Sequence, residues 1–307
     1  MSTSVQGFER AEKRVWERYG VDITTRYVEL REPALRVRVL ECGDGPPVLF
    51  VAGDGAIAAA WAPLLGELSG HRAVVLDRPG FGLSDRLDYR GVGLRRHGVD
   101  LLCALLDALE LDVVPIVGSS GGGQWSLWLA LDAPPRVHAL APMGMPAVCL
   151  PGFRPNANMR LTSAPGLGPL LFAVPSPNPK TTGKMLAKAD ARLPDHPEIV
   201  EAYHAAMRLP GYGRSAAAIF RASMRLGGKA RPTMVLSDAE LARITQPVLF
   251  VWGDHEPFGD PAVARHAASH MPDARVEIVE GGWHHPWLAD TPRIASLLRD
   301  FLAAHDA

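Results

Sequence analysis

Runs of consecutive apolar residues recur along this chain at a length that suits buried β-strands. Continuous apolar runs are typical of strands that are covered on both faces, whereas half-exposed strands alternate. The clearest runs are PVLFVA (47–52), AVVLD (73–77), VVPIVG (113–118), RVHALAPMG (136–144), PVLFVWG (247–253) and RVEIVE (275–280).

Segments with apolar residues at helical spacing separate these runs. They include WAPLLGELSG (61–70), LRRHGVDLLCALLDALEL (94–111), a stretch that begins at Gln124, and RIASLLRDFLAAH (293–305). This alternation predicts an α/β fold with a mostly parallel sheet and helices on both faces. Before it, ERAEKRVWERYG predicts a short amphipathic helix. YVEL and LRVRVLE predict two paired strands joined by a turn at EPA.

Residues 147–243 interrupt the alternation, because they contain no convincing buried strand. The segment is rich in Pro, Gly, Met and Arg, and its pattern favours short helices joined by loops. A loop of this length inside a compact domain would be unusual. The sequence therefore predicts an α/β core made of residues 1–146 and 244–307, with residues 147–243 inserted as a helical lid.

The inserted segment also differs from the core in charge. Residues 151–243 hold thirteen Lys and Arg against six Asp and Glu, a surplus of seven, so the rest of the chain carries minus eight for a total of minus one. A solvated basic face explains this surplus. The alternative is a lid that favours anionic substrates or an acidic partner.

Composition excludes several classes of protein. Lys+Arg 32 against Asp+Glu 33 is not the basic excess of a nucleic-acid binder. The three cysteines have neither disulfide nor metal-site spacing, which favours a reducing compartment. No apolar run reaches the ~18 residues of a membrane span, and the N-terminus has no secretory signal pattern. We expect a cytoplasmic protein that binds neither nucleic acid nor a membrane.

The strand at 113–118 ends in the sequence GSSGGG, which contains one G-x-S-x-G pattern, centred on Ser120. Between a buried strand and a helix, small residues at both flanks permit a sharp turn that exposes the serine. The same turn leaves the Gly121 N–H at a helix N-terminus, where an anion is stabilised. A tight turn or an anion-binding loop without catalysis is the alternative.

With these motifs in order, the chain resembles the α/β-hydrolase superfamily, in particular its lid-bearing, esterase-like branch. DRPGFGLSD (77–85) resembles the signature after that branch's fourth strand. GGWHHPWLAD (281–290) resembles the segment with its catalytic histidine, and VAGDGAIAAAW (51–61) resembles its oxyanion-hole segment. Ala52 departs from the pattern, because the branch usually has a histidine there.

The resemblance implies a Ser–acid–His triad in the chain order that this fold uses. Ser120 is the expected nucleophile and His284 the expected base, with His285 as the alternative. Glu256 is the expected acid, because it precedes a proline as the branch's aspartate does. Asp254 is the alternative acid, although an aspartate in such a turn can simply cap backbone amides.

The resemblance also implies an oxyanion hole made by the backbone N–H groups of Gly121 and Asp54. A carboxylate at position 54 is unexpected, because it would repel the charge that develops there. We expect this carboxylate to turn away and accept hydrogen bonds from amides of the GDGA turn. Protonation of Asp54, or its participation in the chemistry, are the alternatives.

These expectations describe a serine hydrolase that uses no cofactor or metal. Its expected substrate is a small ester, lactone or thioester, which can also be anionic. A specialised enzyme with C–C hydrolysis, lyase, acyl-transfer or cyclisation chemistry is the second hypothesis. A binding module without catalysis is the third. His266 and His270 have a spacing that can bind metal, but an exposed helical face explains it without a third ligand motif.

Overall fold

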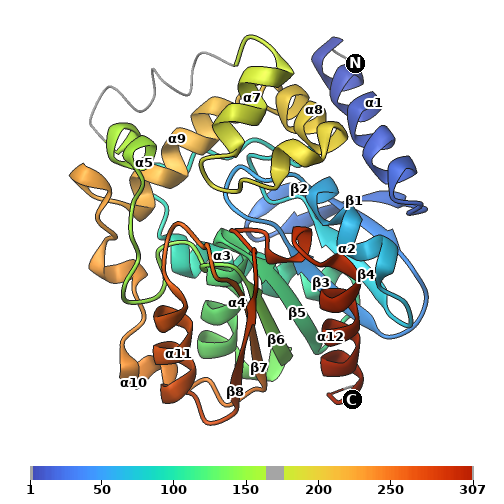
Figure 1. The fold of residues 1–307 in the computed structure, drawn as a ribbon. Coiled ribbons are helices and arrows are strands. Elements are labelled where there is room, and N and C mark those ends of the chain that lie inside the picture. Colours follow the sequence, from blue (N-terminus) through green and yellow to red (C-terminus); the bar gives the residue numbers. More distant parts are fainter. Residues whose placement is uncertain (1–2, 164–175, 306–307) are drawn as a thin grey trace.

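The computed structural model describes residues 3–163 and 176–305, and in this part of the chain eight strands form one sheet (Figure 1). Their order across the sheet is β1-β2-β4-β3-β5-β6-β7-β8. The β1–β2 and β2–β4 pairs are antiparallel and the others are parallel. The strands are β1 (Thr24–Arg31), β2 (Ala34–Cys42), β3 (Pro47–Val51), β4 (Arg72–Leu76), β5 (Val114–Ser119), β6 (Val137–Met143), β7 (Val248–Gly253) and β8 (Ala274–Val279).

The burial of the strands follows their hydrophobic pattern. All six residues of β7 are buried, as are the last four of β3 and of β4. β1 lies at the edge of the sheet and buries only two of its eight residues. The prediction of central strands covered on both faces is therefore confirmed for β3 and β4 and for β7, and the antiparallel pair at the start of the sheet has the predicted place. The prediction of a buried strand at 275–280 is wrong, because β8 lies at the other edge of the sheet and only Val279 of its six residues is buried.

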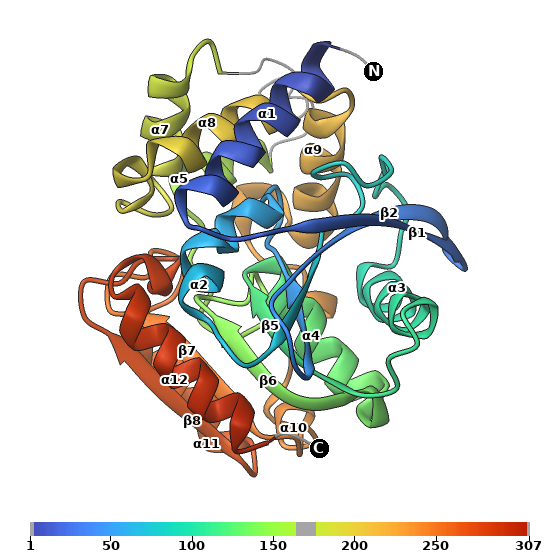
Figure 2. The ribbon, with the colours of Figure 1, turned by 90° about the vertical axis from the view of Figure 1, so that its right-hand side faces the viewer.

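Helices cover both faces of this sheet, as predicted (Figures 1 and 2). On one face lie α2 (Ala62–Glu67) and α12 (Thr291–Ala303), which contact each other. On the other lie α3 (Leu94–Ala108), α4 (Gly121–Asp132) and α11 (Pro261–His270). Within the described residues, no helix is long and apolar enough to cross a membrane.

The described residues between 147 and 243 form helices and loops. Figure 1 places α5, α7, α8 and α9 together beyond one end of the sheet, whereas α10 lies near the opposite end, against α11. The helices are α5 (Ala157–Thr162), α7 (Pro179–Leu186), α8 (Pro197–Ala206), α9 (Tyr212–Ser223) and α10 (Asp238–Leu241). Residues 164–175 of the predicted lid lie outside the described residues.

The N-terminal helix α1 (Thr3–Arg18) lies along α8 of the inserted segment, as Figure 2 shows. Arg14 forms an ion pair with Glu201 at 2.8 Å. Just beyond α1, the Tyr19 hydroxyl lies 2.6 Å from Nδ1 of His196. The sequence predicted a helix in this region but gave no sign that it would contact the insertion.

Candidate active site

The site residues expected from the sequence all follow the carboxyl ends of parallel strands. Asp54 comes after β3, Ser120 after β5, Glu256 after β7 and His284 after β8. Carboxyl ends of parallel strands meet at one edge of the sheet, which is where open α/β sheets bind ligands. The topology therefore brings together four residues that are as much as 230 positions apart (284 − 54) in the sequence.

Ser120 occupies the sharp turn between β5 and α4. Its φ of 50° and ψ of −120° lie outside the regions that non-glycine residues usually adopt, so the turn holds it under strain. The helix begins at Gly121, three residues before the predicted start at Gln124. The glycines that sequence patterns assign to a turn can therefore also form the first turn of a helix.

The flanking glycines are required because the backbone packs tightly around this turn. A Cβ atom on Gly118 would lie 2.7 Å from Cα of Gly123, and one on Gly122 would lie 2.0 Å from the Val51 carbonyl oxygen. Contacts this short are not tolerated. The G-x-S-x-G pattern therefore has a steric cause, which is the close approach of α4 to β5 and β3.

His284 and Glu256 form a buried pair. Nδ1 of His284 lies 2.8 Å from Oε2 of Glu256, whose side chain is fully buried. The same oxygen accepts a hydrogen bond from the Met145 N–H at 2.9 Å, and Oε1 accepts one from the Phe258 N–H at 3.1 Å. Burial alone lowers the pKa of His284, but the charge and hydrogen bond of Glu256, with the charge of Asp190, outweigh it and raise this pKa.

The two alternatives from the sequence lie in different surroundings. Asp254 is one-third exposed, and its ion pair is with the neighbouring His255, at 4.0 Å. His285 does have a carboxylate partner, because its Nδ1 lies 3.0 Å from Oδ2 of Asp190. Each of the two neighbouring histidines therefore contacts its own acid.

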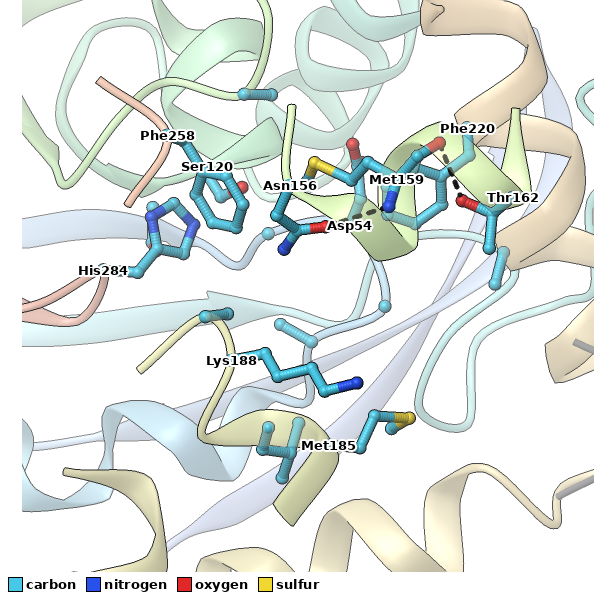
Figure 3. A pocket seen from close by; sticks show the side chains of 18 of the residues that line it. Asp54, Ser120, Asn156, Met159, Thr162, Met185, Lys188, Phe220, Phe258 and His284 are labelled. Atoms are coloured by element: carbon cyan, nitrogen blue, oxygen red, sulfur yellow. Dashed lines mark hydrogen bonds between the residues drawn. The ribbon is translucent and has the colours of Figure 1, made fainter. Parts of the chain in front are cut away.

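Ser120 and His284 line the same cavity, which has a volume of about 210 Å³ (Figure 3). Figure 3 shows the serine and the imidazole on the same side of this cavity, beside the Phe258 ring. Among the hydrogen bonds of the described residues there is none between the Ser120 hydroxyl and His284. Such bonds are often long without substrate and tighten in the reacting complex.

The two amides expected to form the oxyanion hole are unused donors. In the described chain, neither the Asp54 N–H nor the Gly121 N–H donates a hydrogen bond to another protein group. Gly121 is the first residue of α4, where a helix leaves its N–H groups unpaired and favours negative charge. Asp54 lines the cavity, and Gly121 directly follows Ser120, which also lines it.

The Asp54 carboxylate forms an ion pair, which the sequence analysis did not foresee. Its Oδ1 lies 2.7 Å from Nη1 of Arg78, whose side chain is almost completely buried. The expectation that amides of the GDGA turn would bind this carboxylate is wrong. The Arg78 guanidinium, from the loop after β4, binds it instead. A Cβ atom on Gly121 would lie 2.4 Å from this carboxylate oxygen. The pair therefore lies directly behind the candidate oxyanion hole.

Arg78 is held by aromatic packing as much as by hydrogen bonds. Its guanidinium lies 3.8 Å from the ring centroid of Trp125, a cation–π contact. Nε and Nη2 have no hydrogen-bond partner in the described structure. Desolvation and the charge of Arg78 together lower the pKa of the nearby His97 to about 4, so this histidine is neutral. Arg78 lies inside the DRPGFGLSD motif, so its sequence position could have singled it out.

Apolar side chains form most of the cavity wall. Those contributed by the inserted segment include Phe153, Met159, Met185, Leu186, Met207 and Phe220. Tyr212 also lines the cavity, and its hydroxyl donates a 2.8 Å hydrogen bond to the Gly55 carbonyl oxygen. The insertion therefore supplies much of the surface that a substrate would contact. Lys188, also labelled in Figure 3, is exposed and is the single lysine among the described residues that line this cavity.

His266 and His270 acquire a third neighbour in the structure. Asp238, at the start of α10, lies 2.9 Å from Nε2 of His266 and 3.4 Å from Nε2 of His270. These three groups are close enough together to ligate a metal ion. Both contacts are also those of an ordinary surface ion pair, and the trio lies outside the cavity that Ser120 and His284 line.

Known proteins resemble this chain in sequence and in fold. Residues 46–166 match the family model described as alpha/beta hydrolase fold. The 2-hydroxy-6-oxo-2,4-heptadienoate hydrolase of Pseudomonas putida is 29% identical, covering 87% of this chain and 92% of the relative. The rhodomycin D methylesterase DauP of Streptomyces sp. strain C5 is also 29% identical, covering 78% and 84%.

A solved structure extends the likeness over the whole chain. Carboxylesterase CesB from Bacillus subtilis superimposes with a TM-score of 0.78, covering 99% of both chains at 20% sequence identity. At this identity the match shows a shared fold and nothing about a shared substrate. Together with the family model for residues 46–166 and the sheet topology described above, this match shows that the chain has the α/β-hydrolase fold.

Proposed function

We propose that this chain is a serine hydrolase that cleaves a carboxylic ester, lactone or thioester through an acyl-enzyme. The observation that carries the proposal is the buried Glu256–His284 pair, which opens onto the same cavity as Ser120. A serine hydroxyl is a weak nucleophile unless a neighbouring base accepts its proton. A histidine whose other nitrogen is bound to a buried carboxylate is suited to this role.

In the proposed reaction, Oγ of Ser120 forms a bond to the carbonyl carbon while its proton moves to Nε2 of His284. The N–H groups of Gly121 and Asp54 stabilise the negative oxygen of the tetrahedral intermediate. The bond to the leaving group then breaks, and His284 returns the proton to it. Water, deprotonated by His284, attacks the acyl-enzyme in the second half, which releases the acid and restores Ser120.

Glu256 acts through His284 in this proposal. It fixes the tautomer in which Nδ1 carries the proton, and it stabilises the imidazolium that forms during each half-reaction. Its three hydrogen-bond donors, the N–H groups of Met145 and Phe258 and Nδ1 of His284, hold its carboxylate in place. We further propose that residues 147–243 act as the lid of this cavity, since they supply a large part of its apolar wall.

C–C bond hydrolysis is the second candidate reaction. It is favoured by the relative from Pseudomonas putida, whose printed name is that of a 2-hydroxy-6-oxo-2,4-heptadienoate hydrolase. The same groups could serve that reaction, because fold and triad geometry do not decide the bond that is cleaved. Parallel assays of short p-nitrophenyl esters and of 2-hydroxy-6-oxo-2,4-heptadienoate, with the same enzyme preparation, separate the two reactions.

A fluorophosphonate probe tests the proposal without knowledge of the substrate. We expect stoichiometric labelling of Ser120, mapped by peptide mass spectrometry, and no labelling of Ser120→Ala. Ser119 is the internal control, because it has the same chemistry one residue away. Labelling at Ser119, or no labelling of the folded protein, would contradict the proposed nucleophile and favour a binding module without catalysis.

A further inference from the structure

A second histidine–carboxylate pair lies in the same cavity as the first. His285 lines the cavity beside His284, with their ring centroids 5.5 Å apart. Its partner, Asp190, lies between α7 and α8 of the inserted segment and is completely buried. The proposed reaction uses His284 and Glu256, so it leaves this second pair without a role.

Asp190 is ionised and acts only as an acceptor. Its Oδ2 accepts hydrogen bonds from the His285 N–H at 2.6 Å and from Nδ1 at 3.0 Å, and Oδ1 accepts one from the Arg192 N–H at 2.9 Å. Burial alone would raise the pKa of Asp190, but the hydrogen bonds and charge of His285 and the Arg192 amide lower it. Because a carboxylate has no proton to donate, Nδ1 of His285 must carry one.

This arrangement leaves Nε2 of His285 as the available nitrogen. In the described structure Nε2 has no hydrogen-bond partner, and the imidazole lines the cavity. The ring of Trp287 packs edge-on against it, with a centroid distance of 5.0 Å, and holds its orientation. When the imidazole carries a single proton, Asp190 keeps that proton on Nδ1, and Nε2 presents a lone pair, which is a hydrogen-bond acceptor.

The charges around this wall of the cavity select the kind of group that Nε2 can bind. Glu256 and Asp190 place two buried carboxylates behind the imidazoles of His284 and His285. An anionic group beside these rings is repelled, whereas a neutral donor is attracted. Most of the side chains that line the cavity are apolar, so a donor bound here has few competing polar partners.

We propose that Nε2 of His285 accepts a hydrogen bond from a hydroxyl group of the substrate. The His285 ring lies 5.5 Å from the ring of His284, the proposed base, so this hydroxyl is close to the carbonyl that Ser120 attacks. The substrate class is thus a hydroxy-substituted ester. This inference rests on the proposed function, and it adds His285 as the specificity-determining residue and Asp190 as the residue that positions it.

A pair of substrates that differ only in the hydroxyl tests this proposal. Methyl 3-hydroxybutyrate and methyl butyrate are compared by proton release with the wild type, His285→Phe and Asp190→Asn. Phenylalanine keeps a ring of similar size without a nitrogen, and asparagine keeps the shape of Asp190 without its charge. His255→Phe is the matched control, because His255 is exposed and lies outside the cavity wall.

We expect the wild type to prefer the hydroxy ester, and His285→Phe to reduce the ratio of the two kcat/KM values by about tenfold, the scale of one good hydrogen bond. Asp190→Asn should reduce the ratio less, and His255→Phe should leave it unchanged. An unchanged ratio in His285→Phe, or no preference in the wild type, overturns the proposal. So does an equal loss on both esters, which is the mark of a structural role.

Labelling of Ser120 separates a failure of this inference from a failure of the proposed function. If His285→Phe is labelled at the wild-type rate but keeps the wild-type ratio, only the role of His285 is wrong. If neither ester is cleaved and Ser120 is not labelled, the proposed function fails, and this inference fails with it. If His285→Phe abolishes labelling, His285 rather than His284 is the base that activates Ser120.

Discussion

Glu256 reaches His284 with a side chain one carbon longer than that of aspartate, and its surroundings allow for that length. The backbone N–H groups of Met145 and Phe258 hold both carboxylate oxygens, so the extra methylene adds little freedom. Met145 follows β6, so the neighbouring strand helps to position the acid. The sequence favoured Glu256 from its place before a proline, but these two amides could not be foreseen from any local pattern.

Replacing Glu256 is therefore expected to be far more damaging than replacing Asp254. Glu256→Gln removes the charge that stabilises the imidazolium and should lower kcat at least a hundredfold, since loss of such a group can cost ~10⁴. Asp254→Asn, at a position one-third exposed, should change kcat by less than threefold. Steady-state kinetics on one p-nitrophenyl ester measures kcat of both variants. A larger loss in Asp254→Asn than in Glu256→Gln would make Asp254 the acid.

The pH dependence should report His284 directly. Its pKa is raised in the folded protein, and the general base must be neutral, so kcat/KM should fall with decreasing pH at a pH above the ordinary histidine pKa of ~6.5. In Glu256→Gln the charge that raises the pKa is gone while burial remains, so the midpoint of this fall should move to lower pH. A midpoint that is the same in both proteins would mean that another group titrates.

Asp54 illustrates how a single residue can be misjudged when its partner is distant in sequence. A carboxylate beside an oxyanion hole would repel the negative charge that develops there. The Arg78 guanidinium, 2.7 Å from the carboxylate, compensates this charge. The turn could be predicted from the sequence, but the contact across the sheet edge could not.

Substituting Asp54 should affect stability more than chemistry. Asp54→Asn keeps the backbone N–H and the shape, so kcat/KM on a neutral ester should change by less than tenfold. It also leaves the buried Arg78 without its counter-charge, which can cost about 3–5 kcal/mol of folding free energy. Thermal unfolding should show a melting temperature several degrees lower. A loss of activity above a hundredfold in folded protein would instead make Asp54 part of the reaction.

At the scale of elements, the inserted helices are attached to the very loops that carry the candidate site. Tyr212 at the start of α9 bonds the turn that contains Asp54, and Ser215 bonds the Leu87 carbonyl oxygen at 2.8 Å. Asp190 bonds the loop that contains His284. The hydrophobic pattern predicted helices in this region but none of these attachments, because polar contacts between distant segments have no periodicity.

The helix α1 is attached to the core through a buried ionic cluster. Arg38 on β2 donates to both carboxylate oxygens of Glu12 on α1, at 2.7 and 2.8 Å, and its Nε donates to Asp77 at 2.7 Å. All three side chains are almost completely buried. Such a cluster depends on its central cation, because removing one member leaves buried charges uncompensated.

Arg38→Met should therefore lower the free energy of unfolding by about 3–5 kcal/mol, since two buried carboxylates lose their cation. Arg14→Met is the matched control on the exposed surface of α1, where loss of the Glu201 ion pair should cost less than ~1 kcal/mol. Urea unfolding at pH 7 measures the free energy of unfolding of both variants and of the wild type. Equal losses in the two variants would show that burial of the cluster contributes nothing beyond a surface pair.

Across the whole molecule, the arrangement of strands was more predictable than the arrangement of the site. Six strands, β3 to β8, begin and end within one or two residues of the predicted runs. In the five of them that lie inside the sheet, burial on both faces requires consecutive apolar residues, which the sequence displays directly. Strand order also determines which loops meet, so Ser120, Glu256 and His284 were predictable as neighbours. Arg78 stands in the DRPGFGLSD motif, but the motif does not reveal its contact with Asp54. Asp190 lies in no motif, so its contact with His285 was not predictable either.

The charge difference between the inserted segment and the core gives a prediction for the molecule as a whole. If the surplus of seven positive charges in residues 151–243 attracts anionic substrates, kcat/KM for monomethyl succinate relative to methyl butyrate should fall as salt rises. Screening lengths shrink from ~10 Å at 0.1 M to ~3 Å at 1 M ionic strength. A ratio that stays flat over this range would identify the surplus as a solvated surface.

The position of α1 has a consequence for exchanging parts between related enzymes. Transplanting residues 147–243 from a relative is an obvious way to alter substrate range, because this segment forms much of the cavity wall. However, the segment also rests on α1 through Glu201 and His196, and α1 is fixed to the core by Glu12. The exchangeable module is therefore discontinuous, and a successful chimera should carry the donor's N-terminal helix together with its insertion.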